Sequence, residues 1–342
     1  MFDPIVSIII PVYNSEEYLS ECLDSLISQS FQSFEILAVN DGSTDSSLAI
    51  LEKYAKRDDR IIVFNQKNKG ASSARNRALQ EVKGEFVAFV DSDDVVNPEY
   101  LATLFQIAQK QHADLVLFNF DIWFSETCEY KIYSEARSRH LTKNNLFDLL
   151  FSINNSESFG PQGGYIANKF FRYKCIKGKY FNERIYAAED EIFCLSVLDR
   201  LKRIYYCEKC LYHYRQHENS LVHNEQFGIN LMATRLIMLT SREKDERAIA
   251  AYIQCVITYV GATILDSQVN LERLLIVKEH ALRAQHLINE YPKSMIYLSD
   301  YFKRWRCLLS CFVINERILL ITLLFLKILR PRTIWNQIKK RL

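Results

Sequence analysis

The stretch Phe-Val-Ala-Phe-Val-Asp-Ser-Asp-Asp at residues 86–94 joins a run of apolar, strand-forming residues to three carboxylates. The run predicts a buried strand whose C-terminal end brings Asp91, Asp93 and Asp94 to one place. Grouped carboxylates repel one another unless positive charge lies nearby. A Mg²⁺ or Mn²⁺ ion that also binds phosphate would supply that charge. An acidic turn is the alternative, in which Asp94 caps the helix expected after Pro98.

Apolar runs alternate with helical patterns on both sides of this stretch. We expect strands at 6–10, 34–39, 61–64, 86–91 and 114–120, and helices at 16–28, 48–54, 71–82 and 100–111. This alternation predicts an α/β fold with a mostly parallel sheet and helices on both faces. Ligands of such sheets bind at the C-terminal ends of the strands, where residues 11–14, 40–45 and 91–94 all lie. We therefore expect these loops to form one site.

Glycine-based phosphate sites are absent from the sequence. The first expected strand is not followed by G-x-G-x-x-G, and no Walker lysine loop occurs in the chain. Only nine of the 342 residues are glycine. Phosphate therefore has to be bound by something other than a glycine loop, which favours the metal interpretation of residues 91–94.

Two further features lie in the middle of the chain. Glu189, Asp190 and Glu191 open an expected helix, where they either stabilise its N-terminal dipole or take part in chemistry. The segment Leu-Tyr-His-Tyr-Arg at 211–215 predicts a short strand, in which His213 is either a metal ligand or a core histidine.

The composition, 49% hydrophobic and 25% charged, is that of a globular protein and excludes a disordered chain. Nine cysteines at irregular spacings include one C-x-x-C, at 207 and 210, without the second pair that a zinc site needs. We expect reduced thiols in a reducing compartment. The initial Met-Phe-Asp-Pro lacks the basic region of a signal peptide.

The last 42 residues carry ten Lys or Arg against Glu316 alone, while the rest of the chain is acidic. Residues 312–330 are very apolar, yet the run 318–326 is far shorter than the ~20 residues of a membrane crossing. An amphipathic, basic helix in the membrane interface fits this pattern. The alternatives are a helix that packs on its own domain and a dimer contact, whereas the apolar face argues against nucleic acid.

Four motifs in order resemble the family 2 glycosyltransferases. They are Val-Ser-Ile-Ile-Ile-Pro-Val-Tyr-Asn at 6–14, Asn-Asp-Gly-Ser-Thr-Asp at 40–45, Asn-Lys-Gly-Ala-Ser-Ser-Ala-Arg-Asn at 68–76 and Asp-Ser-Asp-Asp at 91–94. The resemblance covers residues 5–215 and implies the GT-A fold, an inverting reaction and a UDP-sugar donor. Asn40 departs from the family's usual Asp.

The resemblance also implies roles for individual residues. Asp190 would be the general base and Glu189 a residue that orients it, while Asn168 and Lys169 resemble a motif near the acceptor entrance. Asp93 would bind the Mn²⁺ or Mg²⁺ ion, with His213 as a further ligand. The expected donor-binding residues are Pro11, Tyr13, Asp41, Arg75, Asp91 and Ser92.

We therefore expect a GT-A domain at 1–222, with a donor half at 1–120 and an acceptor half at 121–222, followed by a helical region at 223–342. The expected activity is transfer of a sugar from a UDP-sugar to a hydroxyl of a glycan, or lipid-linked glycan, in bacterial surface polysaccharide synthesis. The expected location is cytoplasmic and peripheral, on the inner face of the membrane, and a homo-oligomer is possible. The alternative is a catalytically silent relative that acts as a subunit of a glycan-synthesis complex.

Overall fold

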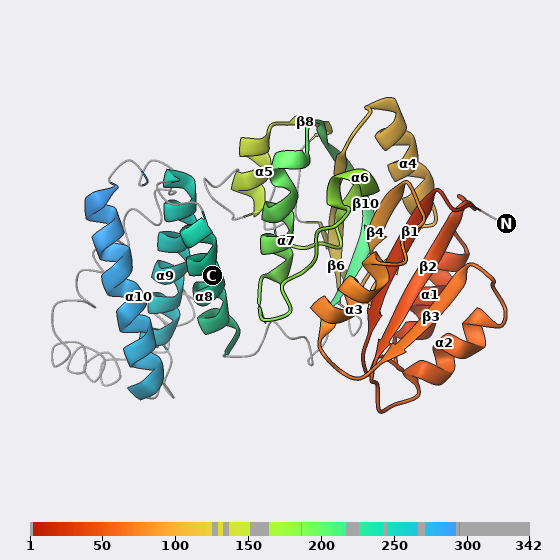
Figure 1. The fold of residues 1–342 in the computed structure, drawn as a ribbon, viewed down its shortest axis with the longest axis horizontal. Coiled ribbons are helices and arrows are strands. Elements are labelled where there is room, and N and C mark those ends of the chain that lie inside the picture. Colours follow the sequence, from red (N-terminus) through yellow and green to blue (C-terminus); the bar gives the residue numbers. More distant parts are fainter. Residues whose placement is uncertain are drawn as a thin grey trace. The chain divides into compact units, whose positions relative to one another are not determined.

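The chain divides into two compact units, Met1–Asn224 and Glu225–Leu342 (Figure 1). In this computed structural model the described residues are 3–124, 129–132, 137–150, 164–185, 187–216, 226–241, 245–265, 271–291 and 294. The boundary predicted at 222–223 lies outside them, and the donor and acceptor halves stay predictions.

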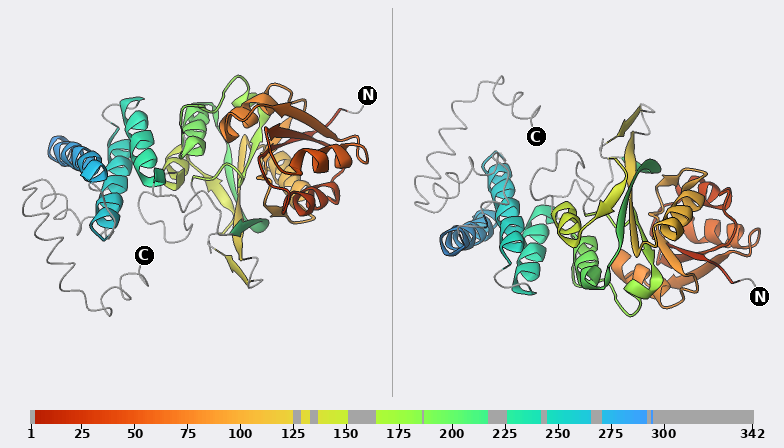
Figure 2. Two further views of the ribbon diagram at one scale, coloured as in Figure 1. Left: turned by 90° about the horizontal axis from the view of Figure 1, so that it is seen from below. Right: turned by 90° about the horizontal axis from the view of Figure 1, so that it is seen from above.

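The first unit is built on a ten-stranded sheet with helices on both of its faces (Figures 1 and 2). Its strands are β1 (Val6–Val12), β2 (Phe34–Asp41), β3 (Ile61–Gln66), β4 (Phe86–Phe89), β5 (Val95–Val96), β6 (Leu115–Phe124), β7 (Glu129–Ile132), β8 (Arg139–Leu141), β9 (Lys169–Arg172) and β10 (Ile204–Gln216). Its helices are α1 (Leu19–Ile27), α2 (Ser47–Ala55), α3 (Ala71–Leu79), α4 (Tyr100–Lys110), α5 (Lys143–Leu150), α6 (Tyr173–Ile176), α7 (Glu189–Val197) and the 3₁₀ turn η1 (Leu198–Arg200).

The parallel part of the sheet is as predicted. The strand order is β3-β2-β1-β4-β9-β6-β10-β5, and the pairs β3–β2, β2–β1, β1–β4 and β6–β10 are parallel. The sequence pattern assigned no strand to β9, which is antiparallel to both β4 and β6. The short strand expected at 211–215 is instead the C-terminal part of the 13-residue β10. The sheet is therefore mixed, and β9 is what joins its two parallel parts.

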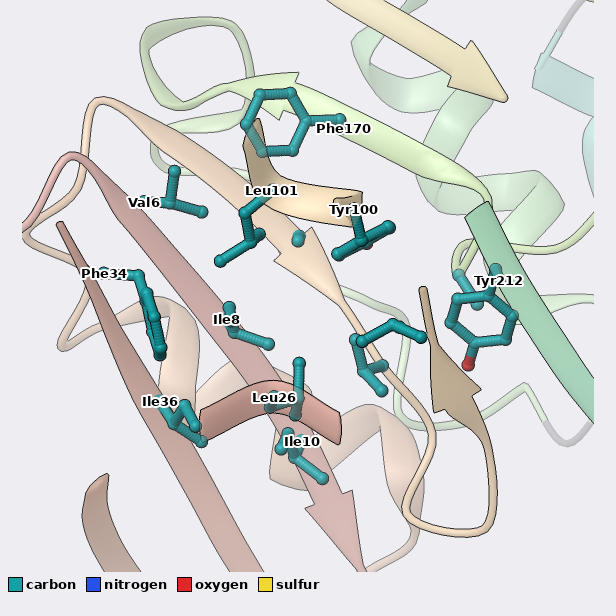
Figure 3. Packing of buried hydrophobic residues seen from close by; sticks show 14 of the residues in the cluster. Val6, Ile8, Ile10, Leu26, Phe34, Ile36, Tyr100, Leu101, Phe170 and Tyr212 are labelled. Carbon is teal, nitrogen blue, oxygen red and sulfur yellow. The ribbon is translucent and has the colours of Figure 1, made fainter. Parts of the chain in front are cut away.

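The first face of the sheet packs against α1, α2 and α4. Side chains alternate between faces along a strand, and Val6, Ile8 and Ile10 of β1 point into this layer (Figure 3). Leu26 of α1 and Tyr100 of α4 close it, and all five residues are fully buried. Phe34 and Ile36 of β2 and Phe86 of β4 extend the same layer.

The second face packs against α3 and α7. Phe89 of β4 contacts Phe181 and Phe193 edge to face, with ring centroids 5.7 and 6.1 Å away, while Phe181 and Phe193 stack at 4.1 Å. Phe193 belongs to α7, so this aromatic cluster packs the helix against β4.

Several element ends differ from the predicted ones. Helix α1 begins at Leu19 rather than at residue 16, and α3 ends at Leu79 rather than at 82. Residue 84 is a glycine because the chain passes too close to β1 for a side chain: a Cβ would lie 2.6 Å from the Ser7 backbone nitrogen. Six cysteines, among them Cys207 and Cys210, are free thiols in the part of the chain that the structure describes.

The second unit contains α8 (Gln226–Ser241), α9 (Glu246–Leu265) and α10 (Leu271–Glu290). Helices α9 and α10 are joined by a hydrogen bond of 2.8 Å between the Tyr252 hydroxyl and His280 Nδ1. None of the described helices combines the length and the apolarity that crossing a bilayer takes. The amphipathic basic tail predicted at 312–330 lies outside the described residues.

Candidate active site

Arg75 of α3 joins the acidic groups from two distant parts of the chain. Its Nη2 donates to Asp91 Oδ1 at 3.0 Å, and its Nη1 donates to Glu189 Oε1 at 3.1 Å and Asp190 Oδ1 at 3.2 Å. The guanidinium side chain is only 6% exposed. The loop after β4 and the first turn of α7 therefore meet at one buried cation, although 98 residues separate Asp91 from Glu189 in sequence.

Asp190 has the properties of a base that works near neutral pH. Burial raises the pKa of Asp190 to about 7; the neighbouring carboxylates of Glu189 and Asp91 add to the rise, and Arg75 opposes it. A carboxyl group with such a pKa can take a proton and give it up again at physiological pH.

The backbone around Asp190 is held in an unusual conformation. Ala188, the N-cap of α7, has φ 58° and ψ 29°, a left-handed conformation that costs an alanine about 1–2 kcal/mol. The backbone N–H of Ile166 donates to Asp190 Oδ2 at 3.0 Å. The fully buried Lys169 fastens the turn that carries Ile166, because its Nζ donates to the Tyr165 carbonyl and to Asn168 Oδ1. Strain and two fixed donors thus set the direction of the Asp190 carboxylate.

The three carboxylates after β4 have different surroundings. Asp91 and Asp93 are partly exposed, whereas Asp94 is fully buried. The carboxylate of Asp94 accepts from the Tyr212 hydroxyl at 2.5 Å and from the Arg215 backbone N–H at 2.8 Å. The alternative in which Asp94 caps the next helix is wrong: the N-cap of α4 is Glu99, and the Asp94 carboxylate bonds to β10. Asp91 and Asp93 are thus the two partly exposed carboxylates of the Asp-Ser-Asp-Asp motif.

His213 of β10 has its Nδ1 2.8 Å from Asp121 Oδ1 of β6. A carboxylate accepts hydrogen bonds, so Nδ1 carries a proton, and in the neutral imidazole Nε2 is then the nitrogen with the lone pair. A carboxylate behind the ring is the usual arrangement for a histidine that binds a metal. The residue pair therefore fits the ligand role that the resemblance implies for His213.

The donor set can also be tested as a whole. No group of three or more His, Cys, Asp or Glu side chains is arranged to hold a metal ion within the described ranges. A Mg²⁺-type ion is commonly held by one or two carboxylates together with the phosphates of a substrate. Asp91 and Asp93, both partly exposed in the loop after β4, would supply those one or two carboxylates, and the diphosphate of a nucleotide would complete such a site.

The other predicted donor-binding residues lie at or just beyond the C-terminal ends of β1, β2 and β4. Tyr13 is 49% exposed beyond β1, close to the partly buried Pro11. Asn14 connects this loop with the next, because its side-chain oxygen accepts from the Thr44 N–H at 2.8 Å. The Ser92 hydroxyl lies 2.6 Å from that of Ser15, and this bond joins the loops after β1 and β4.

Asp41 is 2% exposed, and its carboxylate is already occupied. It accepts from Gln66 Nε2 at 2.8 Å and from the backbone N–H groups of Lys69 and Gly70, at 2.9 and 2.7 Å. The carboxylate therefore ties the end of β2 to the start of α3, the helix that carries Arg75. A polar hollow of about 560 Å³ lies beside it, lined by Asn40, Gly42, Ser43, Leu48 and residues 65–68.

Sequence reasoning missed the groups that hold the acidic residues in place. They are the Ile166 amide, Tyr212 and Arg215; Asp121, which holds His213, was missed as well. Arg215 in the aromatic run 211–215 and Asp121 in the apolar run 115–124 were signals in the sequence, because a charge in a buried strand needs partners. The Ile166 amide leaves no signal, since any residue type supplies a backbone N–H.

The comparisons with known proteins agree with this geometry. The profile described as "Glycosyl transferase family 2" matches residues 7–174. EpsH of Bacillus subtilis (strain 168), which carries a glycosyltransferase name, is 32% identical over 261 residues, 72% of this chain and 72% of EpsH. The uncharacterized glycosyltransferase EpsJ of the same strain is 36% identical over 220 residues, 64% of this chain and 63% of EpsJ.

Among solved structures, that of S. aureus TarS 1-349 in complex with UDP-GlcNAc has a TM-score of 0.67 with this chain. The match covers 91% of each chain at 22% identity and thus bears on the fold. The predicted motifs, the GT-A sheet and the similarity to EpsH lead to the same assignment. The chain belongs to glycosyltransferase family 2 and is a transferase enzyme with the GT-A fold.

Proposed function

We propose that this enzyme transfers a sugar from a UDP-sugar to a hydroxyl group of a glycan acceptor, with inversion at the anomeric carbon. The observation that carries the proposal is the junction at Arg75, where Asp91 from the predicted donor side meets Glu189 and Asp190 from the predicted acceptor side. The UDP-GlcNAc complex of TarS supports a UDP-sugar donor by similarity of fold. Surface polysaccharide synthesis is supported by relatives such as the poly(ribitol-phosphate) β-glucosyltransferase of Bacillus spizizenii.

Asp190 serves as the general base in this proposal. Its carboxylate takes the proton of the acceptor hydroxyl while that oxygen forms a bond to C1 of the sugar. The bond between C1 and the diphosphate oxygen breaks at the same time, and UDP leaves with the electron pair. A single displacement inverts C1, so a second nucleophile is unnecessary. Glu189 keeps the pKa of Asp190 high and shares Arg75 with it.

Asp93 would hold the Mn²⁺ or Mg²⁺ ion, with Asp91 or His213 as a further ligand. The bound ion would stabilise the negative charge that develops on the leaving diphosphate. Arg75 lies against Asp91 and adds fixed positive charge on the same side. Pro11, Tyr13, Asp41 and Ser92 shape the site for the nucleotide through the loops that they connect.

We further propose that the acceptor is linked to lipid and that the tail at 312–330 holds the enzyme peripherally on the inner face of the cell membrane. The support is the amphipathic, basic composition of that tail. Truncation after Arg306 should abolish flotation with liposomes that contain anionic lipid. Unaltered flotation of the truncated protein would remove the membrane claim.

The direct test of the activity is UDP release by Asp93→Asn and Asp190→Asn. Each substitution keeps the side-chain volume but removes one carboxylate, and each should lower kcat/KM about 10²–10⁴-fold. Asp59→Asn is the matched control, because Asp59 is exposed in the loop before β3. Wild-type release by both site variants would contradict the mechanism and favour a silent subunit. A thermal-shift panel of nucleotide sugars with Mn²⁺ would identify the donor, since a ligand that binds the folded state raises Tm.

A further inference from the structure

The Asp91–Asp94 loop is fastened to β10 by a buried network. Tyr212 contributes the central group: its hydroxyl accepts from the Asp91 N–H at 3.1 Å and donates to Asp94 Oδ2 at 2.5 Å. Tyr212 is 1% exposed and Asp94 is fully buried. One hydroxyl group therefore connects the first and last residues of the acidic loop.

Arg215, three residues after Tyr212 on β10, holds the same loop. Its backbone N–H donates to Asp94 Oδ1 at 2.8 Å, and its Nε donates to the Asp93 carbonyl at 2.8 Å. The guanidinium group is itself fixed: it lies 3.9 Å from the centroid of the Trp123 ring and pairs with Glu21 of α1 at 2.5 Å. The backbone of Asp93 is thus bonded to a side chain that Trp123 and Glu21 hold in turn.

Strand pairing reinforces this attachment. The two residues after the loop, Val95 and Val96, form β5 and pair with His213 and Tyr212 of β10. Strand β10 therefore holds the chain before Asp93, through the Asp91 N–H, and after it, through the pairing of Val95 and Val96. His213, the proposed further ligand, belongs to the same strand.

We propose that Tyr212 and Arg215 are positioning residues that hold the Asp91–Asp94 loop in the geometry that binds the divalent cation and the diphosphate. This inference rests on the proposed function. Neither side chain is a ligand in it: Tyr212 sets the Asp91 and Asp94 ends of the loop, and Arg215 sets the peptide of Asp93.

Two substitutions test the inference without changing the net charge. Tyr212→Phe removes only the hydroxyl group, and Arg215→Lys keeps the positive charge but loses the planar fork that bonds the Asp93 carbonyl and Glu21. Long-range electrostatics predicts unchanged cation binding in both variants. Positioning predicts weaker binding, by about tenfold or more, as for other groups that orient metal ligands.

Tyr100→Phe is the matched control. Tyr100 is equally buried, and its hydroxyl has no hydrogen-bond partner among the described residues. The measurement is the Kd of Mn²⁺ by isothermal titration calorimetry in the presence of UDP, with circular dichroism to check the fold. Saturating Mn²⁺ should restore most of kcat in Tyr212→Phe and Arg215→Lys, because the chemical groups remain in place.

The possible outcomes separate the inference from the proposed function. If wild-type protein binds neither Mn²⁺ nor UDP, the proposed function fails. If wild type binds both and folded Tyr212→Phe and Arg215→Lys bind Mn²⁺ within twofold of it, the positioning inference is overturned. Loss of the fold in both variants would likewise overturn it, because the two residues would then be structural. Weaker binding in both, with Tyr100→Phe unchanged, would support it.

Discussion

Replacing Glu189 with Gln should move the pH dependence of the reaction toward lower pH. The pKa of Asp190 is raised by burial to about 7, and the charge of Glu189 contributes to the rise. Glu189→Gln removes that charge and leaves Asp190 a larger share of Arg75. Both changes favour the ionised form of Asp190, so its pKa should fall.

The size of this effect follows from the geometry. Both carboxylates contact Arg75 Nη1, at 3.1 and 3.2 Å, so these oxygens lie no more than about 6 Å apart. Two unit charges at that distance repel by about 2.8 kcal/mol at an effective dielectric constant of about 20. That energy corresponds to a pKa change of about 2, and solvent screening of Glu189, which is 22% exposed, reduces it to about 1.

The assay is kcat/KM for UDP release between pH 5 and pH 9, which reports the pKa of the free enzyme. The base is active when ionised, so wild-type activity should rise with pH and level off above about pH 7. The rise of Glu189→Gln should be centred near pH 6, so that at pH 6 the variant retains about fivefold more of its own plateau than wild type. Glu81→Gln, on an exposed ion pair with Arg77, is the control and should behave as wild type. If kcat/KM falls at the same acidic pH in wild type and in Glu189→Gln, the reasoning is refuted.

Three stability predictions follow from other contacts. Arg75→Met leaves three carboxylates without their shared cation and should lower the free energy of unfolding by about 3–5 kcal/mol in urea titrations, most strongly above pH 7. The control Arg77→Met removes a more exposed ion pair and should lower it by less than about 1 kcal/mol. Equal losses in the two variants would contradict the ion-pair account. Ala188→Gly relieves the strain of a left-handed alanine, so it should raise Tm and increase the free energy of unfolding by up to about 1 kcal/mol. Gly70→Ala should lower Tm, because Gly70 has φ 90° with open space around it. A lower Tm for Ala188→Gly would refute the strain at Ala188. Gly84→Ala drives a Cβ against the Ser7 and Val6 backbone and should cost about 1–3 kcal/mol or more; a neutral result by thermal melting would show that β1 and the turn at Gly84 can move apart.

Much of the parallel sheet could be predicted because its signal is local. Each of β1 to β4 is a short apolar run that ends in polar loop residues, and that pattern alone fixes which loops share an edge of the sheet. Strand β9 was not predicted because it has only four residues and is antiparallel to both β4 and β6. Long-range pairing, rather than its own composition, specifies such a strand. The length of β10 was missed because the register shifts near Cys207 and Cys210 interrupt its alternation.

The candidate site was predicted in its composition but not in its connections. The motifs indicated Asp91, Asp93 and Asp190, since carboxylates after a buried strand or at a helix start are visible in sequence. The position of Arg75 between Asp91 and Asp190 depends on how α3 and α7 pack on one face of the sheet, which sequence does not show. The same holds for Asp94, which sequence could not separate from Asp93 and which burial assigns to the support of the loop.

The central claim is that the loops at the strand ends gather around one cation-bound diphosphate, with Asp190 on the acceptor side. Crystals soaked with UDP and Mn²⁺, measured for anomalous scattering of manganese, test it most directly. The account predicts one manganese peak at about 2.0–2.2 Å from the Asp93 carboxylate, shared with the UDP phosphates. A manganese and UDP site away from Asp93 and the Arg75 junction would contradict it.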